Sequence, residues 1–115
     1  MAAVAPHSFY TSFPLGRHWV ELLPPYNEHL VTDVGGLYLG FAVLFAWGAL
    51  TLQPVLVRAS CCAWLLTEAL HLGFHAAHLD GFDTGDAIAQ LTSLAFLLVP
   101  AGVAIWAAAE PTQDA

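Results

Sequence analysis

The chain has 115 residues, of which 58% are hydrophobic and 10% charged, whereas about a quarter of the residues in an ordinary soluble domain are charged. This composition excludes intrinsic disorder and predicts an integral membrane protein surrounded by lipid. The net charge of −7, with 2 Lys and Arg residues in all, excludes a nucleic-acid partner, because phosphate binding requires clustered basic side chains.

The N-terminal segment, residues 1–26, is predicted to lie at the membrane–water interface. Its prolines break any long helix, and its dense aromatic side chains are of the kind that favours the interface. We expect one short helix here, from Leu15 to Leu23, ended by Pro24-Pro25. The segment lacks the basic start and apolar core of a signal peptide, so the first spanning helix is expected to direct insertion.

Three apolar segments follow, and each is long enough to cross a bilayer, which takes about 20 residues. The predicted fold is therefore all-α: a transmembrane domain at residues 27–109 with three helices in an antiparallel bundle, followed by a polar tail at 110–115. The helices are expected at about 27–52, 55–79 and 86–109.

Two glycines in the first apolar segment indicate a close helix contact. Gly36 and Gly40 form a G-x-x-x-G pair, which lets another helix approach closely. At 100° per residue they share a face with His29 and Asp33. We expect this face to point into the bundle and to serve association, either in a homo-oligomer or with other membrane subunits.

The basic residues predict an orientation in the cell membrane. Arg58 follows the Gln53-Pro54 turn, and no Lys or Arg lies in the loop at residues 80–86. The positive-inside rule then places the turn in the cytoplasm and the end rich in His and Asp on the outer side. Arg17 favours the opposite orientation.

The second apolar segment carries four ionisable residues on one helical face. Glu68, His71, His75 and His78 fall within about 80° of one another around the helix axis. Histidines at i and i+4 can bind one metal ion, and Glu-x-x-His recurs in di-iron helix bundles. Because ionisable groups in a bilayer are expensive, such a set indicates a functional site.

An antiparallel bundle would bring further ligands to the same end. His29 and Asp33 begin the first helix, and Asp86 begins the third within a polar stripe that includes Gln90. Imidazole together with carboxylate favours a transition metal such as zinc, iron or copper. The predicted metal ligands are therefore His71, His75, His78, His29, Glu68, Asp33 and Asp86.

Two other interpretations of these residues stay open. They could form a polar rim that is hydrogen-bonded to water and lipid headgroups. Alternatively, His29 with His71 or His75 could bind haem, although the acidic surroundings suit haem propionates poorly. No elbow-type Ser or Cys motif indicates a hydrolase.

Two stretches of the sequence resemble a known group. Pro25-Tyr26-Asn27-Glu28-His29 and the later F-H-x-x-H-L-x-G-F stretch, residues 74–82, are similar to small uncharacterised bacterial multi-pass membrane proteins. The chain resembles the DoxX-like four-helix membrane proteins more distantly, and the resemblance covers about residues 9–98. It implies a membrane fold and no particular activity. The usual additional first helix is absent, which either a shortened start or a partner that supplies the helix would explain.

The sequence thus predicts a small membrane subunit that binds a transition metal within a larger complex. The alternatives are a structural or assembly subunit without a cofactor and a haem- or quinone-linked redox subunit. Enzymatic activity of the chain on its own is not expected.

Overall fold

The computed structural model describes residues 1–23 and 25–108, where all regular secondary structure is helical. The short α1 (Pro6–Ser12) precedes three helices of 24 residues each, α2 (Glu28–Thr51), α3 (Pro54–Ala77) and α4 (Thr84–Ala107). At 1.5 Å per residue each long helix measures about 36 Å, enough to cross a hydrocarbon core of about 30 Å. The three predicted spanning segments are therefore confirmed as long apolar helices. The predicted tail at 110–115 lies outside the described residues.

Local sequence signals set the ends of the long helices. The side chains of Asn27 and Asp83 accept backbone N–H bonds in the first turns of α2 and α4, at 3.1 and 2.8 Å. Leu52 ends α2 in the left-handed conformation, and α3 begins at Pro54, whose missing N–H is harmless in a first turn. The expected tight turn at Gln53-Pro54 is therefore confirmed.

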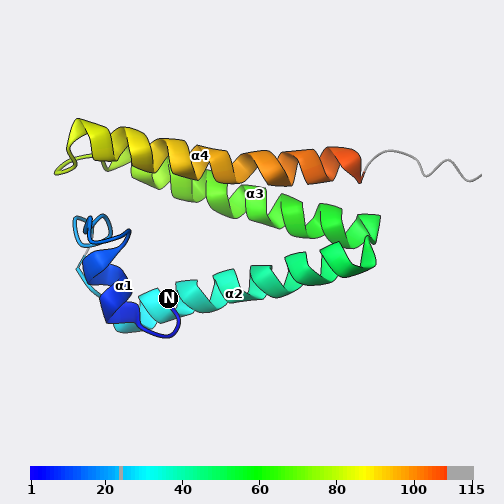
Figure 1. The fold of residues 1–115 in the computed structure, drawn as a ribbon, viewed down its shortest axis with the longest axis horizontal. Coiled ribbons are helices and arrows are strands. Elements are labelled where there is room, and N and C mark those ends of the chain that lie inside the picture. Colours follow the sequence, from blue (N-terminus) through cyan, green and yellow to red (C-terminus); the bar gives the residue numbers. More distant parts are fainter. Residues whose placement is uncertain (24, 109–115) are drawn as a thin grey trace, which may run out of the picture.

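The three long helices form an open arrangement with α3 in the middle. Helix α3 packs against α4 along much of its length and against α2 less extensively. Helix α2 meets α3 near the turn between them and diverges toward the end where α1 lies (Figure 1). Within the described residues the backbones of α2 and α4 do not come close to each other, and the expected antiparallel bundle is not confirmed.

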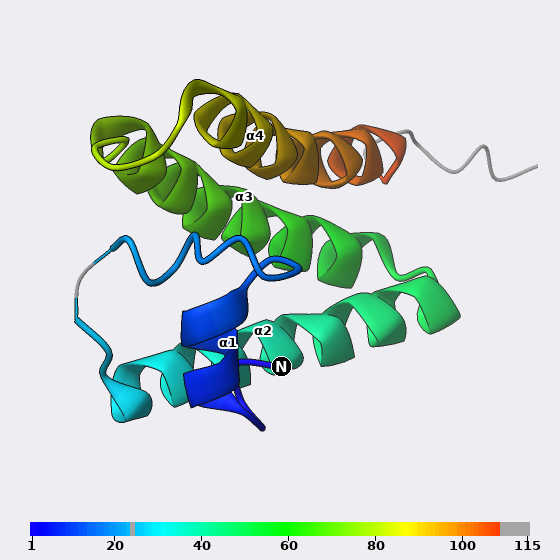
Figure 2. The same ribbon diagram turned by 60° about the vertical axis from the view of Figure 1, so that its left-hand side comes forward.

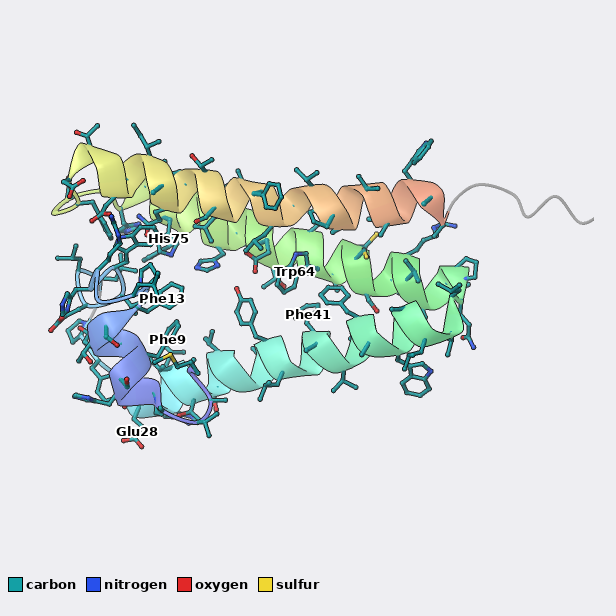
Figure 3. The ribbon with its side chains drawn as sticks, in the orientation of Figure 1. Phe9, Phe13, Glu28, Phe41, Trp64 and His75 are labelled. Atoms are coloured by element: carbon teal, nitrogen blue, oxygen red, sulfur yellow. The ribbon has the colours of Figure 1, made fainter. Side chains whose placement is uncertain are left out.

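An aromatic cluster centred on Trp64 joins the three long helices. Its indole ring lies 5.5, 5.3 and 5.3 Å from the rings of Tyr38, Phe41 and Phe45 on α2, measured between centroids. Its Nε1–H donates to the carbonyl oxygen of Leu97 on α4 at 3.1 Å. Figure 3 shows Trp64 and Phe41 between their helices. The inner face of α2 is therefore its aromatic face.

The glycine face of α2 does not point inward, contrary to expectation. A Cβ atom added at Gly36 or Gly40 would meet nothing within 4 Å, and Trp47 on the same face is 58% exposed. The glycine that contacts α3 is Gly48, which lies against Val57. Large aromatic side chains bury more apolar area than glycines do, and they decide which face of α2 turns toward α3.

The N-terminal helix occupies a different position from the predicted one. It spans Pro6–Ser12, with a proline in its first turn, whereas residues 15–23 contain no helix. Leu15, Gly16 and His18 have positive φ angles of 51°, 80° and 60°, which no right-handed helix contains. The expectation of a helix from Leu15 to Leu23 is therefore wrong.

The N-terminal segment lies across the end where α2 diverges from α3. Helix α1 lies against α2, and Figures 1 and 2 both place the chain after α1 between α2 and the α3–α4 pair. The backbone of Ala3 is so close to Gly35 of α2 that any Cβ there would collide with it. Arg17 forms an ion pair with Asp86 at the start of α4, and the Trp19 side chain is buried. The segment thus partly closes the open end.

The outer surfaces of the long helices are strongly apolar. Only 11–17% of their most hydrophobic windows is buried inside the chain. Leu50, Val55 and Trp106 are 85%, 81% and 68% exposed. Soluble monomers rarely expose contiguous apolar patches larger than a few hundred Å². This surface matches a lipid environment and supports a multi-pass membrane protein.

Candidate functional site

Five polar side chains from three helices gather beyond Trp64, toward the end that the N-terminal segment covers. Glu68, His71 and His75 follow one another at i, i+3 and i+7 on one face of α3. Tyr38 reaches them from α2 and Gln90 from α4. We call Tyr38, Glu68, His71, His75 and Gln90 the polar cluster. Figure 3 shows His75 at the end of α3 that the N-terminal segment covers.

Glu68 is the most deeply buried member of the polar cluster. Its side chain has no exposed surface, and the Tyr38 hydroxyl donates to its Oε1 at 2.6 Å. Its Oε2 has no hydrogen-bond partner and lies 3.5 Å from Nδ1 of His71. No Lys or Arg among the described residues pairs with it. A carboxyl group buried in this way indicates a specific role, because burying one unpaired is expensive.

His71 and His75 direct one nitrogen each at the other ring. The two Nε2 atoms lie 3.0 Å apart, and the opposite edge of the His71 ring places Nδ1 3.2 Å from the Tyr38 hydroxyl. Two nitrogens 3.0 Å apart and each about 2.1 Å from one ion would subtend about 90° at that ion. The pair can therefore either share a proton or bind a metal ion together.

Gln90 and the far edge of His75 lack the hydrogen bonds that their burial requires. Gln90 is 2% exposed and His75 is 9% exposed. The Gln90 amide lies beside His75, yet neither its Nε2 nor its Oε1 makes a hydrogen bond of normal geometry, and the same holds for Nδ1 of His75. Buried polar atoms are almost always paired, so these atoms mark a polar spot in an otherwise apolar helix interface.

An apolar groove of about 650 Å³ opens beside the polar cluster. Tyr38, His71 and His75 are among the residues that line it. Tyr10 and other side chains of the N-terminal segment also line it. The rest of the lining is chiefly apolar and comes from α2 and α3: Leu30, Val31, Val34, Leu37, Phe41 and Phe74.

The predicted partners from α2 are not brought to the histidine pair. His29 Nε2 lies 3.4 Å from Asp33 Oδ2, as the i,i+4 spacing suggests, but the two side chains are 86% and 56% exposed. Glu28, the neighbour of His29 in sequence, points away from α3 (Figure 3). Because α2 diverges from α3 at this end, a haem bridging His29 and His75 gains no support.

The two remaining predicted ligands have other partners. His78 follows the last turn of α3, where its Nδ1 lies 2.8 Å from the Phe74 carbonyl oxygen and its ring stacks on Phe74 at 4.1 Å. Asp86 is ion-paired with Arg17. Within residues 1–23 and 25–108, no group of three or more His, Cys, Asp or Glu side chains is arranged to hold a metal ion. The predicted seven-residue set is thus divided, with Glu68, His71 and His75 kept together.

Tyr38 and Gln90, the two members of the cluster outside the predicted ligand set, each stand out in the sequence. Tyr38 carries the only hydroxyl between Val34 and Leu50, in an otherwise apolar stretch. Gln90 is the only amide side chain in α4. A single hydrogen-bonding side chain in a spanning helix commonly faces another helix, because lipid offers it no partner.

Comparison of the chain with protein-family models, curated proteins and solved structures finds no match.

Proposed function

We propose that this chain is a small multi-pass membrane subunit that binds one transition metal ion through the Nε2 atoms of His71 and His75. The 3.0 Å separation of these two atoms is the observation that carries the proposal. The opposite edge of His71 faces Glu68 and the Tyr38 hydroxyl. A histidine that binds a metal commonly donates its other ring N–H to a partner that orients it, and here the Tyr38 hydroxyl, itself bonded to Glu68, lies 3.2 Å from Nδ1 of His71.

The accessible side of the histidine pair supports a site with open coordination positions. Two imidazoles from this chain would leave two positions of a tetrahedral ion, and the groove that His71 and His75 line offers a route to them. Water or a group from another subunit fills these positions. Imidazole ligands suit zinc, iron and copper, and the buried Glu68 carboxylate compensates part of the ion's charge.

The outward glycine face supports membership of a larger assembly. Gly36 and Gly40 leave open space next to the α2 backbone, where a helix of a second copy or another subunit can pack closely. We also propose that the end carrying the polar cluster lies on the outer side of the cell membrane. This orientation rests on Arg58, near the turn at the opposite end of α3.

Metal content per chain tests the proposal. The protein is purified without chelator and without a histidine-rich tag, reconstituted in lipid nanodiscs and analysed for zinc, iron and copper. We expect His71→Ala and His75→Ala each to remove most of the metal. His7→Ala and His18→Ala are matched controls from the N-terminal segment and retain it. His29→Ala also retains it, because His29 is exposed and pairs with Asp33.

A second candidate function is that of a structural subunit without a cofactor. It is favoured by the separation of the α2 and α4 backbones among the described residues, since a partner helix can complete the arrangement. Wild-type protein that is free of metal, fails to take up added zinc, copper or iron, and still assembles with other membrane proteins would establish this function. An absorption spectrum of the purified protein tests the haem-linked alternative.

A further inference from the structure

We propose that residues 1–23 form a lid, which opens to admit metal ions from water to the groove beside His71 and His75. This inference rests on the proposed metal site and concerns how an ion reaches it. The lid lies at the end where α2 and α4 begin and α3 ends, and it crosses the opening between α2 and α3 (Figures 1 and 2). Three of its side chains line the groove: Tyr10, Val20 and Leu23.

The end that the lid covers is the route from water to the histidine pair. His71 lies six residues before Ala77, the last residue of α3, and therefore about 9 Å inside the end of that helix. The lining of the groove is chiefly apolar, and its flanks face hydrocarbon in a membrane. Because a charged ion enters hydrocarbon only at a high cost, it approaches from the aqueous end and passes the lid.

A glycine of α2 seats the first residues of the lid. The backbone of Ala2 and Ala3 crosses Gly35 so closely that an added Cβ would lie 2.8 Å from the carbonyl carbon of Ala2 and 2.8 Å from Cα of Ala3. Both are backbone atoms, so rotation of a side chain cannot relieve the collision. Position 35 therefore accepts only glycine while the lid is closed.

An ion pair fastens the later part of the lid to α4. Arg17 pairs with Asp86, and the Arg17 side chain is 56% exposed. Exposed ion pairs contribute little to stability, so this latch breaks readily. Leu15 and His18, on either side of Arg17, have φ angles of 51° and 60°, which residues with a Cβ adopt at a cost. The latch thus holds a strained loop, which is free to move when the ion pair breaks.

Cysteine labelling in lipid nanodiscs measures how often the lid is open. Val31, which lines the groove, is replaced with Cys in protein whose two native cysteines are changed to Ala, and the rate of its reaction with a water-soluble maleimide is followed. We expect Gly35→Ala to raise this rate about tenfold or more, because its methyl group displaces the backbone of the lid. Gly102→Ala, which adds a methyl group to α4 in open space, is the matched control and should leave the rate unchanged. Alanine favours a helix more than glycine does, so both variants keep the fold.

Two further variants test the latch from its two sides. Arg17→Gln and Asp86→Asn should each raise the labelling rate about two- to fivefold, the range that an exposed ion pair allows. The double variant should label no faster than either single variant, because both substitutions remove the same bond.

Equal labelling rates in wild type and Gly35→Ala, or effects of Arg17→Gln and Asp86→Asn that multiply in the double variant, would overturn the inference. Release of bound Zn²⁺ to a chelator should accelerate in the variants that label faster, and equal release from wild type and Gly35→Ala would also overturn it. If wild type binds no Zn²⁺, the proposed function fails, whereas the labelling rates still decide whether residues 1–23 are a lid over the groove.

Discussion

Replacing Tyr38 with Phe removes one oxygen atom from the centre of the polar cluster. The Tyr38 hydroxyl donates to Glu68 at 2.6 Å and lies 3.2 Å from Nδ1 of His71. The phenyl ring can keep its edge-on contact with Trp64, so the substitution tests the hydrogen bonds rather than the packing. Because Oε2 of Glu68 already has no partner, Tyr38→Phe leaves the whole buried carboxyl group without a donor of normal geometry.

The structure sets the size of the expected effect. Leaving a buried acceptor unsatisfied costs about 1–3 kcal/mol, whereas hydrogen bonds between membrane helices average about 0.6 and reach about 1.7 kcal/mol. The Tyr38–Glu68 bond is short and its acceptor is fully buried, which places it at the upper end of the membrane range. We therefore expect Tyr38→Phe to lower the free energy of unfolding by about 1.5 kcal/mol, roughly tenfold in the equilibrium constant.

Reversible unfolding in mixed micelles with increasing SDS measures this change. Tyr26→Phe is the matched control, because Tyr26 lies in the N-terminal segment and its contacts with His7 and Tyr10 are between rings. A double-mutant cycle with Glu68→Gln should return a coupling energy of about 1 kcal/mol. If Tyr38→Phe and Tyr26→Phe unfold at the same SDS concentration, the polar cluster does not hold α2 to α3.

Three further predictions concern packing, assembly and topology. Trp64→Phe should destabilise the protein by about 1–2 kcal/mol, because it removes the hydrogen bond from Trp64 to Leu97 of α4. Trp106→Phe, at an exposed site, should have no such effect, and equal midpoints of SDS unfolding for the two variants would contradict this prediction. Gly36→Leu should leave the monomer stable and weaken chemical cross-linking between subunits, so unchanged cross-linking would exclude this face as the interface. Single cysteines at Gln53 and Thr84, with both native cysteines replaced, should be labelled from opposite sides of the membrane; labelling from one side would refute the three-span topology.

The helices could be predicted from the sequence more reliably than their arrangement. Their length follows from uninterrupted apolar stretches, and their ends follow from residues with local effects, such as Asn27, Pro54 and Asp83. The face of α2 that turns inward depends on competition between glycines and aromatic side chains, which periodicity alone does not resolve. Trp64 of α3 decides it by contacting Tyr38, Phe41 and Phe45.

Only the part of the candidate site that lies on a single helix, α3, could be predicted from the sequence. Glu68, His71 and His75 share a face of α3 because helix geometry requires it. The expected contribution of His29 depended on the angle between α2 and α3, which the sequence does not encode locally. Helices α2 and α3 lie far apart at the end that carries the polar cluster, and the N-terminal segment lies between them there. Arg17, expected only as a topology signal, pairs with Asp86 there.

X-ray absorption at the metal edge tests the central claim most directly, namely that His71 and His75 bind the same ion. Wild-type protein in nanodiscs is loaded with one equivalent of Zn²⁺, and the fine structure is fitted for imidazole and sulfur neighbours. The proposal predicts two imidazole ligands at about 2.0–2.1 Å, reduced to one or none in His75→Ala. A spectrum that lacks paired imidazoles, or one dominated by sulfur at about 2.3 Å from Cys61 or Cys62, would contradict it.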